Sequence, residues 1–473
     1  MQLTKTNFIH YLNCPKSLWV YKHDHDNYPQ GLFSAFLQKL TREGYEVEEY
    51  VRQLLVKNSL GNIDFQKAFE TEDGLFARAD AFEITKDERA ILCEVKSSTR
   101  IKTDNIHSHL KDACFQLITA ERSGQAIEQV KIIHLDGSYI RKGNIVPQDL
   151  LHIEDVTERV REIYDETEIE INQAITLLRE EEIDRKGCSC ISKSRANHCD
   201  TFKYFNPNVP KQSIYILPRL NDNRRRELID KDVFDLQDVK TDFPLSELQS
   251  VVLRAAQTGE PQIDRAAIRG FLNTFQFPLH FFDFETFASA IPLVDGSSPH
   301  KHFPVQYSLH TLDEDGTLNH KEFLQRELQL PGNLVAQMQQ DFGEDGSVVS
   351  WHASFEKTQN REMAKWFPDS ADFLKQLNDR MVDLKDVFKM SYVDAKFGGS
   401  TSIKKVLPVV CPHLGYDDLD VQDGTSAMDA WQRMINAKGE EADQLAANLL
   451  EYCKLDTFAM VEIHRFLMAL SND

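Results

Sequence analysis

The sequence has no long apolar run, no excess of positive charge and no regular cysteine pattern. No apolar stretch approaches the roughly 18 residues that a membrane helix needs, and residues 1–20 lack the unbroken apolar core of a signal peptide. We therefore expect a cytoplasmic protein with no membrane partner. The net charge of −21 argues against broad, non-specific binding to nucleic acid, but it leaves room for a local basic groove. Nothing in the sequence identifies a protein partner.

Eight cysteines in 473 residues do not make a secreted disulfide framework. Their spacing is uneven, because Cys188, Cys190 and Cys199 are clustered, Cys14 lies near the start and the other four are scattered. A chain of this length is also too long for a single hydrophobic core. About two to four domains are therefore expected.

Hydrophobic periodicity divides the chain into three predicted parts. Residues 1–205 show helices, paired strands, a further helix and strand, and then one long acidic helix over residues 155–183, an order that indicates an α/β unit. Residues 206–276 contain short helical pieces and are predicted to form a helical connector. Residues 277–473 begin with three consecutive strands and end in a long helix. The predicted fold class is a multidomain α/β protein.

Two carboxylates stand where the pattern predicts a buried strand. In "HFFDFETF" (residues 280–287), Asp283 and Glu285 are two positions apart, so both side chains lie on the same face of the strand. Like charges in an apolar setting repel each other and lose hydration. A bound divalent cation such as Mg²⁺ or Mn²⁺, which prefers oxygen ligands, would remove that penalty. The simpler alternative is a strand face that happens to carry two charges.

Further candidates for the same site come from later segments. Glu356 follows the predicted strand "SVVSW", and Asp456 lies on the last predicted helix. Tyr452 precedes Asp456 by one helical turn, so both side chains can face one site. Two divalent ions about 3.5–4 Å apart would clamp the attacking and leaving oxygens of phosphodiester hydrolysis.

This order of motifs resembles the DEDD 3′-5′ exonucleases, the DnaQ-like branch of the ribonuclease H-like fold. The resemblance covers residues 277–473 and implies that Tyr452 orients or helps to deprotonate the attacking water. The family usually has Asn-Ala-x-Phe-Asp as its second motif, whereas this chain has "HASFE". The metal ligands that the resemblance implies are Asp283, Glu285, Glu356 and Asp456.

A second set of acids, with a lysine, lies in the N-terminal part. Asp80 ends one predicted strand, and Glu94 and Lys96 share a face of the next strand. Acids can bind a metal, and a lysine can steady the nucleophile or the charge that develops on the phosphorus centre. The set resembles the PD-(D/E)xK nuclease core, which implies that Asp80 and Glu94 are metal ligands. An exposed strand with a Glu-x-Lys pattern is the simpler alternative.

Three further features extend this resemblance to the RecB nuclease module and to Cas4-like proteins. Glu48 follows Gly44 by four residues, which matches a metal-binding acid or histidine on an early helix of those proteins. Gln116 matches a helical glutamine that faces the site, although the tyrosine often found one turn later is Ala120 here. Those proteins also close the domain with four cysteines, matched here by Cys14, Cys188, Cys190 and Cys199.

Four thiolates from the two ends of a domain could bind a [4Fe–4S] cluster or Zn²⁺. The resemblance favours the cluster, although Cys-x-Cys-x8-Cys differs from the family's usual Cys-x2-Cys-x5-Cys. His198 beside Cys199 keeps zinc open as an alternative. The simplest alternative is that Cys188, Cys190 and Cys199 are unpaired cysteines in a loop that bind no metal.

Taken together, the two halves resemble the bacterial DUF2779 family, which couples a Cas4-like module to a DnaQ-like one. The segments that carry this resemblance are "KSRANHCDTFKYFNP" (193–207) and "PLHFFDFETF" (278–287). It implies nuclease chemistry but supplies no assigned substrate. We expect a metal-dependent nuclease with two centres and with DNA as partner ahead of RNA, and analogy of fold suggests a setting in repair, recombination or defence. Two other hypotheses stay open. The N-terminal half could be an inactive nucleic-acid clamp, with only the C-terminal half active, or the chain could be a scaffold without activity.

Overall fold

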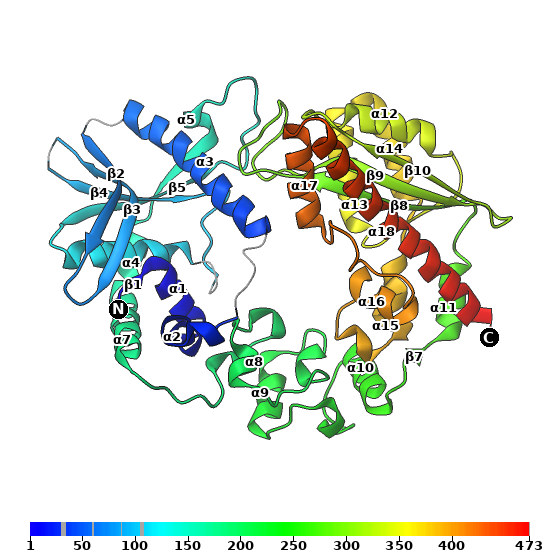
Figure 1. The fold of residues 1–473 in the computed structure, drawn as a ribbon, viewed down its shortest axis with the longest axis horizontal. Helices are drawn as coiled ribbons and strands as arrows, with labels where there is room; N and C mark the ends of the chain where they lie inside the picture. Colours follow the sequence, from blue (N-terminus) through cyan, green and yellow to red (C-terminus); the bar gives the residue numbers. More distant parts are fainter. Residues whose placement is uncertain (30–34, 59–60, 87, 105–107, 473) are drawn as a thin grey trace. The chain divides into compact units, whose positions relative to one another are not determined.

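The computed structural model describes residues 1–29, 35–58, 61–86, 88–104 and 108–472 (Figure 1). Its contacts divide the chain into two units. Unit 1 comprises Met1–Asn208 and Ser289–His300, and unit 2 comprises Val209–Ala288 and Lys301–Asp473. Both units are mixed α/β structures, each with its own sheet. Most of the segment predicted as a connector lies in unit 2. Among the described residues, no helix combines the length and apolarity needed to cross a membrane.

The sheet of unit 1 is built in the order β1-β3-β4-β5-β6, with β2 paired to β3. Its strands are β1 (Leu3–Thr4), β2 (Asn62–Glu70), β3 (Leu75–Ile84), β4 (Ala90–Lys96), β5 (Ile127–Leu135) and β6 (Leu151–Asp155). The pairs β1–β3 and β4–β5 are parallel, and the remaining pairs are antiparallel. The sequence pattern predicted β3, β4 and β5 but not β2 or β6.

Helices cover both faces of this sheet. They are α1 (Lys5–Asn13), α2 (Pro15–His23), α3 (Ala35–Asn58), α4 (His109–Arg122), α5 (Pro147–Leu150), α6 (Thr157–Glu162), α7 (Tyr164–Arg179) and α8 (Phe202–Phe205). On one face, Leu92 of β4 packs in a core with Phe115 of α4. On the other face, its neighbour Ile91 packs in a core with Val47 of α3. The prediction of one helix over residues 155–183 was wrong, because α6 and α7 are separate helices that meet at Ile163.

The second stretch of unit 1 follows directly from a strand of unit 2. Ala290 and Ile291 join the core beside α3, and Arg141 donates hydrogen bonds to the carbonyl oxygens of Pro292 and Leu293 at 3.0 and 2.7 Å. This crossover carried no sequence signal, because its residues resemble an ordinary surface loop.

Unit 2 contains a five-stranded sheet in the order β10-β9-β8-β11-β12 and a small sheet of β13 and β7. The strands are β7 (Gln262–Ile263), β8 (Leu279–Phe287), β9 (Phe303–Leu312), β10 (Leu318–Leu324), β11 (Ser347–Ser350), β12 (Met381–Asp383) and β13 (Tyr392–Val393). The antiparallel β8–β9–β10 meander confirms the three consecutive strands that the sequence predicted. The strands β8, β11 and β12 run parallel. The central strand β8 is buried at every position but Asp283, so both of its faces are covered, which explains its nearly continuous apolar run.

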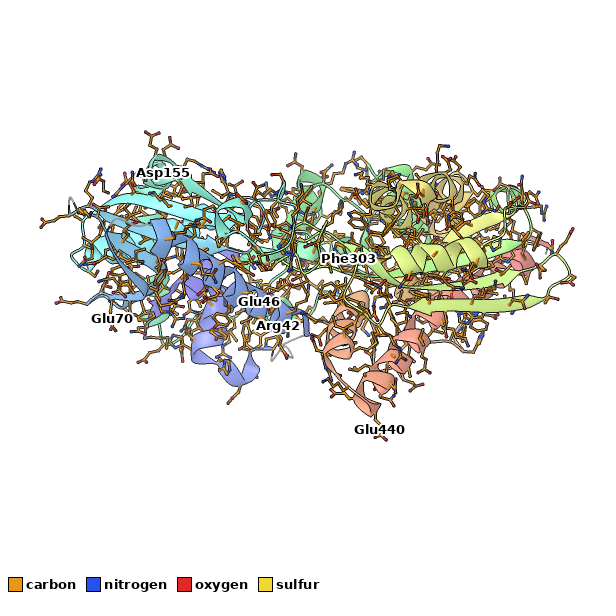
Figure 2. The ribbon with its side chains drawn as sticks, turned by 90° about the horizontal axis from the view of Figure 1, so that it is seen from above. Arg42, Glu46, Glu70, Asp155, Phe303 and Glu440 are labelled. Atoms are coloured by element: carbon orange, nitrogen blue, oxygen red, sulfur yellow. The ribbon has the colours of Figure 1, made fainter. Side chains whose placement is uncertain are left out.

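The helices of unit 2 are α9 (Asp222–Asp230), α10 (Glu247–Thr258), α11 (Arg265–Leu272), α12 (Gly332–Asp341), α13 (Ser354–Trp366), α14 (Ala371–Asp379), α15 (Val387–Met390), α16 (Ile403–Val410), α17 (Gly424–Asn436) and α18 (Glu440–Asn472). Phe282 and Phe284 of β8 pack in one core with residues of α12, α13 and α14. The long α18 contacts β8 and β9 as well (Figure 1). In Figure 2, Phe303 marks the first residue of β9 and Glu440 the first residue of α18.

Candidate functional site

The first candidate site is an acid centre in unit 2. Asp283 and Glu285 alternate along β8 with the phenylalanines of the core, so they point to the opposite face of the sheet. Glu356 stands in the first turn of α13, and Asp456 lies midway along α18. Glu285, Glu356 and Asp456 are buried, with exposed fractions of 8, 2 and 7%. The charges of Glu356, Asp456 and Glu285 help to raise the pKa of Asp283, and those of Asp456 and Glu356 help to raise the pKa of Glu285. The structure therefore brings the four predicted carboxylates close together.

Burial and mutual repulsion make these carboxylates hard to ionise. Loss of hydration, followed by the nearby acids, raises the pKa of Asp283 and of Glu285 well above the usual range. Burial raises the pKa of Glu356 to about 8 and that of Asp456 to about 6. The ammonium group of Lys404 opposes this effect by lowering the pKa of Glu285. The group therefore needs more positive charge before all four acids can ionise.

The donor atoms of the acid centre fit a hard divalent cation. Oε2 of Glu356 is buried without a hydrogen-bond partner, which is costly unless something else contacts it. Ligand atoms of Asp283, Glu285 and Cys453 lie within 4.8 Å of one another. The pKa of the Cys453 thiol is raised well above its usual value by burial and then by Asp283, so the carboxylates are the better ligands for Mg²⁺ or Mn²⁺.

Two tyrosines and a lysine border the acids. The hydroxyl of Tyr416 donates a hydrogen bond of 2.6 Å to Oδ1 of Asp456. Lys404 Nζ donates to the hydroxyl of Tyr452 at 3.2 Å and lies over both tyrosine rings. Burial and then Asp456 raise the pKa of Tyr452, so its hydroxyl keeps its proton. Tyr416 was missed from the sequence, because it lies in a loop without a recognisable motif.

The second candidate site is the acid-and-lysine centre of unit 1. Glu94 is 1% exposed and accepts hydrogen bonds from Lys5 at 2.6 Å and from Lys96 at 2.7 Å. Gln116 of α4 also donates to Glu94, and Lys96 contacts the carboxylate of Asp112. Burial alone would raise the pKa of Glu94, but the two lysines outweigh it and lower that pKa. The negative charge of this carboxylate is therefore already compensated by two ammonium groups.

Glu48 and Asp80 are linked to each other by a side chain that the sequence did not reveal. Asp80 Oδ2 accepts a hydrogen bond of 2.7 Å from the amide of Val95, while burial and then Glu94 raise its pKa to about 8. Gln66 Nε2 donates to Glu48 at 3.0 Å and to Asp80 at 3.5 Å. Gln66 has φ of 61° and is not paired with Asp80 opposite it, although the β2–β3 register is the same on both sides, so its side chain is placed by a local irregularity of the strand.

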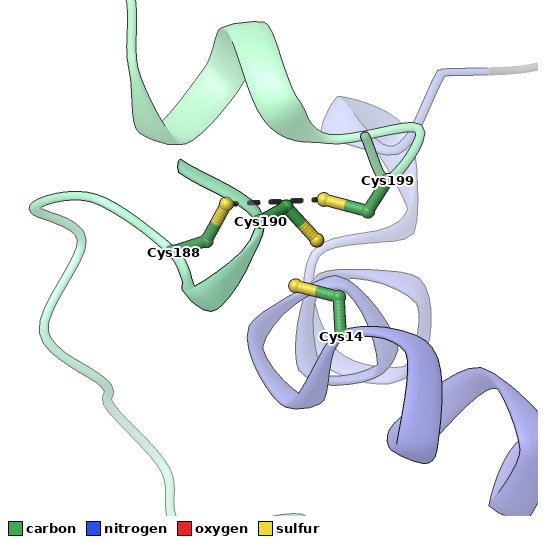
Figure 3. Close-up of side chains that lie close together, drawn as sticks. All are labelled: Cys14, Cys188, Cys190 and Cys199. Atoms are coloured by element: carbon green, nitrogen blue, oxygen red, sulfur yellow. Dashed lines mark hydrogen bonds between the residues drawn. The ribbon is translucent and has the colours of Figure 1, made fainter. Parts of the chain in front are cut away.

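The third candidate site is the cysteine cluster, shown in Figure 3. Cys14 joins α1 to α2, and the other three members, Cys188, Cys190 and Cys199, lie before α8. All four are buried free thiols whose sulfur atoms lie within 4.8 Å of one another, with Cys188 and Cys199 3.9 Å apart. Such a group could hold a metal. The group does not include His198, whose Nε2 lies 3.2 Å from the carbonyl oxygen of Lys193.

Comparison with known proteins gives a family match over the core of unit 2. The model of the domain of unknown function DUF2779 matches residues 280–402. This stretch begins in β8 and ends just before α16, so it contains three of the four acids but neither Tyr452 nor Asp456.

Curated relatives match about two fifths of the chain. The uncharacterized protein MG366 of Mycoplasma genitalium is 30% identical over 212 residues, which cover 40% of this chain and 32% of the relative. Its homolog in Mycoplasma pneumoniae is 30% identical with the same shares, and UU173 of Ureaplasma parvum is 26% identical over 221 residues. The match thus spans about a third of each relative. Among solved structures, SSO0001 overlaps 36% of this chain and 75% of its own at 13% identity, but its TM-score of 0.21 carries no argument about fold.

Replacement of Cys14 tests whether the cysteine cluster holds a metal. We expect Cys14→Ser to lose bound metal and to destabilise unit 1 by several kcal/mol, because metal binding to such a site adds directly to folding free energy. Elemental analysis and thermal unfolding of the full chain measure both effects. Cys114→Ser is the matched control, since Cys114 is also buried but lies outside the cluster. Equal metal content in the two variants would contradict the assignment.

Replacement of Asp283 tests the repulsion in the acid centre. In chelator, Asp283→Asn removes one charge and almost no volume, so we expect it to stabilise unit 2 by on the order of 1 kcal/mol or more, the equivalent of about one pKa unit. Mg²⁺ should stabilise the wild-type chain and have less effect on the variant, because ligands stabilise the form that binds them. Thermal unfolding with Asp369→Asn, an exposed position, as control measures this. Destabilisation by Asp283→Asn in chelator would mean that the carboxylate has a structural partner.

Proposed function

We propose that the chain is a metal-dependent nuclease whose acid centre in unit 2 removes nucleotides from 3′ ends. The observation that carries this proposal is the convergence of four poorly ionisable carboxylates from β8, α13 and α18 on one place. A stable protein gains nothing from such an arrangement unless a cation completes it. The 3′ polarity rests on the resemblance to DEDD exonucleases and the ribonuclease H-like fold that it implies.

The side chains around the acids have distinct tasks in this proposal. Two divalent ions held by the carboxylates would supply the clamp on the attacking and leaving oxygens. Tyr416 fixes one oxygen of Asp456, which leaves the other oxygen for a ligand role. Tyr452 keeps its proton, so its hydroxyl orients the attacking water and does not act as a base. Lys404 holds that hydroxyl in place and contributes positive charge near the phosphate.

The centre in unit 1 is proposed as a PD-(D/E)xK-type site that cuts or trims DNA. The placement of Asp80, Glu94 and Lys96 beside Gln116 supports this assignment. One observation favours a second candidate function, an inactive nucleic-acid clamp: Glu94 is already paired with Lys5 and Lys96. DNA is the proposed partner ahead of RNA, in repair, recombination or defence.

We further propose a single tetrahedral ion, such as Zn²⁺, in the cysteine cluster. Thiolates around one tetrahedral zinc ion with bonds of about 2.3 Å lie about 3.8 Å apart, and Cys188 and Cys199 have this separation. A [4Fe–4S] cluster interposes iron atoms and needs thiolates farther apart. The resemblance to Cas4-like proteins favours the iron–sulfur alternative. Protein purified without oxygen should be colourless with about one zinc per chain, whereas a brown protein with about four irons would establish the cluster.

Substitutions in the acid centre test the exonuclease. Asp283→Asn and Asp456→Asn should each abolish trimming of end-labelled DNA with Mg²⁺ or Mn²⁺, because both carboxylates would hold the metals. Tyr452→Phe should retain metal binding and slow trimming by about 10²-fold, a loss of the size expected when the attacking water is no longer held in position. The assays use a Lys96→Ala background to silence unit 1. Full trimming by both Asn variants in that background would refute the proposal.

Substitution of Lys96 separates the two candidate functions of unit 1. In an Asp283→Asn background, any remaining cleavage should disappear with Lys96→Ala while binding of DNA is largely retained, since the lysine would act on the reacting phosphate. Lys131→Ala, on the neighbouring strand β5, is a control. If Asp283→Asn alone leaves no hydrolysis on any DNA or RNA form, the clamp is the better description of unit 1.

A further inference from the structure

We propose that a cationic pocket in unit 2 binds the backbone phosphates of the strand whose 3′ end reaches the acid centre. This inference rests on the proposed exonuclease function and names where the substrate lies. The pocket has a volume of about 840 Å³. Its walls carry four cations, Arg219, Arg224, Lys385 and Lys389, together with hydroxyls that include those of Ser400 and Thr401.

The charge of this pocket is unusual for a chain with a net charge of −21. Within the described residues, the guanidinium groups of Arg219 and Arg224 make no hydrogen bond or ion pair, whereas Lys389 pairs with Asp386 and Lys385 Nζ lies 3.0 Å from Nδ1 of His352. Asp394 also lines the pocket, but its Oδ1 already accepts a hydrogen bond of 2.8 Å from the amide of Lys396. Unpaired cations that face a cavity are suited to phosphate oxygens.

The two walls are held together by direct backbone packing. Gly399 has φ of 73°, and a Cβ atom at this position would lie 2.2 Å from the carbonyl oxygen of Ile216. Ile216 belongs to the segment that the sequence predicted as a connector. That segment thus packs against the loop before α16 with no room for a side chain. The pocket is therefore a preformed feature of unit 2.

The same loops lead from the pocket to the acid centre. Lys385 is two residues beyond Asp383, whose Oδ1 accepts a hydrogen bond of 2.9 Å from the amide of His352, four residues before Glu356. Thr401 is three residues before Lys404, which donates to Tyr452. A nucleic-acid strand whose 3′-terminal phosphodiester lies at the carboxylates would therefore place phosphates farther from its 3′ end at the pocket. A chain of phosphates also matches several spaced cations better than a single small anion does.

The test is binding of a labelled single-stranded DNA oligonucleotide to the full chain, measured by fluorescence anisotropy in an Asp283→Asn background. The double variant Arg219→Ala, Arg224→Ala should bind more weakly, with a salt slope smaller by about 1.4 for two lost phosphate contacts. Lys385→Ala, from the other wall, should weaken binding in the same direction. Arg226→Ala is the matched control, because Arg226 lies on the same helix as Arg224 but is exposed and outside the pocket.

The outcomes separate this proposal from the exonuclease assignment. If the double variant and Lys385→Ala both bind like Arg226→Ala while Asp283→Asn still abolishes trimming, the pocket does not bind the DNA, and the exonuclease proposal is retained. If the wild-type chain trims no DNA but the pocket variants lose binding, the pocket binds DNA and the exonuclease proposal is rejected. Absence of binding by the Asp283→Asn chain overturns the pocket. In the active chain, the double variant should raise KM and leave kcat unchanged.

A different observation supports a second inference: we propose a transition-metal site on unit 1 formed by His134, His152 and Glu154. His134 and His152 are directly paired across β5 and β6, and Glu154 is two residues from His152 on the same face. One ligand atom of each lies within 4.8 Å of the others. Two histidines and one glutamate are a ligand set that Zn²⁺ uses in proteins, with a fourth position open.

Neighbouring contacts already orient two of these ligands. Nδ1 of His134 lies 2.9 Å from the carbonyl oxygen of Leu135, and a hydrogen bond there leaves the lone pair of Nε2 for a metal. That Nε2 is 3.8 Å from Oε2 of Glu154, while the other oxygen of Glu154 accepts from Arg159 at 2.5 Å. Such outer hydrogen bonds are typical of histidine and carboxylate ligands.

Calorimetric titration of the full chain with Zn²⁺ in excess Mg²⁺ tests this site. The wild-type chain should bind one more Zn²⁺ than His152→Ala or Glu154→Gln, and zinc should raise the thermal midpoint of the wild type by more than that of either variant. His152 is exposed, so its removal should not disturb folding. His413→Ala, at another exposed histidine, is the control and should bind as the wild type does. Equal zinc uptake by His152→Ala and the control would overturn the site.

Discussion

Repulsion among the buried carboxylates around β8 is the constraint on which unit 2 depends. The strand alternates phenylalanines, which pack under α12–α14, with Asp283 and Glu285 on the opposite face. The same strand thus provides part of the core and half of the acid centre. Tyr416 and Lys404 relieve the repulsion only in part, since the pKa values of the acids remain raised. The arrangement is explained if the structure is complete only with bound cations.

The two acidic centres solve the problem of buried charge in opposite ways. In unit 1, Glu94 is surrounded by Lys5, Lys96 and the amide of Gln116, so its charge is compensated within the protein. In unit 2, the acids face mainly one another. A cation is therefore needed more in unit 2, whereas in unit 1 it would have to compete with two ammonium groups for Glu94. This difference is the physical reason why the nuclease proposal rests mainly on unit 2.

The sequence predicted those parts of the sites whose residues lie only a few positions apart on one strand or helix. The spacing of Asp283 and Glu285, the Tyr-x-x-x-Asp turn and the Glu-x-Lys pair follow from strand and helix periodicity. Lys5 and Tyr416 were not predicted, because each reaches its site from a distant segment with no local pattern. The crossover of residues 289–300 into unit 1 was missed for the same reason. Long-range packing, and not local propensity, decides these positions.

Backbone strain marks several of the places where local reasoning failed. Among the described non-glycine residues with positive φ are Gln66, Arg219 and His352. Gln66 bridges two acids of unit 1, Arg219 lines the cationic pocket, and the amide of His352 donates to Asp383 near Glu356. Each such conformation costs on the order of 1–3 kcal/mol and persists only where the surrounding structure imposes it. At these three positions the fold holds the side chains against their local preference, whereas Glu88, Asp232 and His300 adopt positive φ without being assigned to a site.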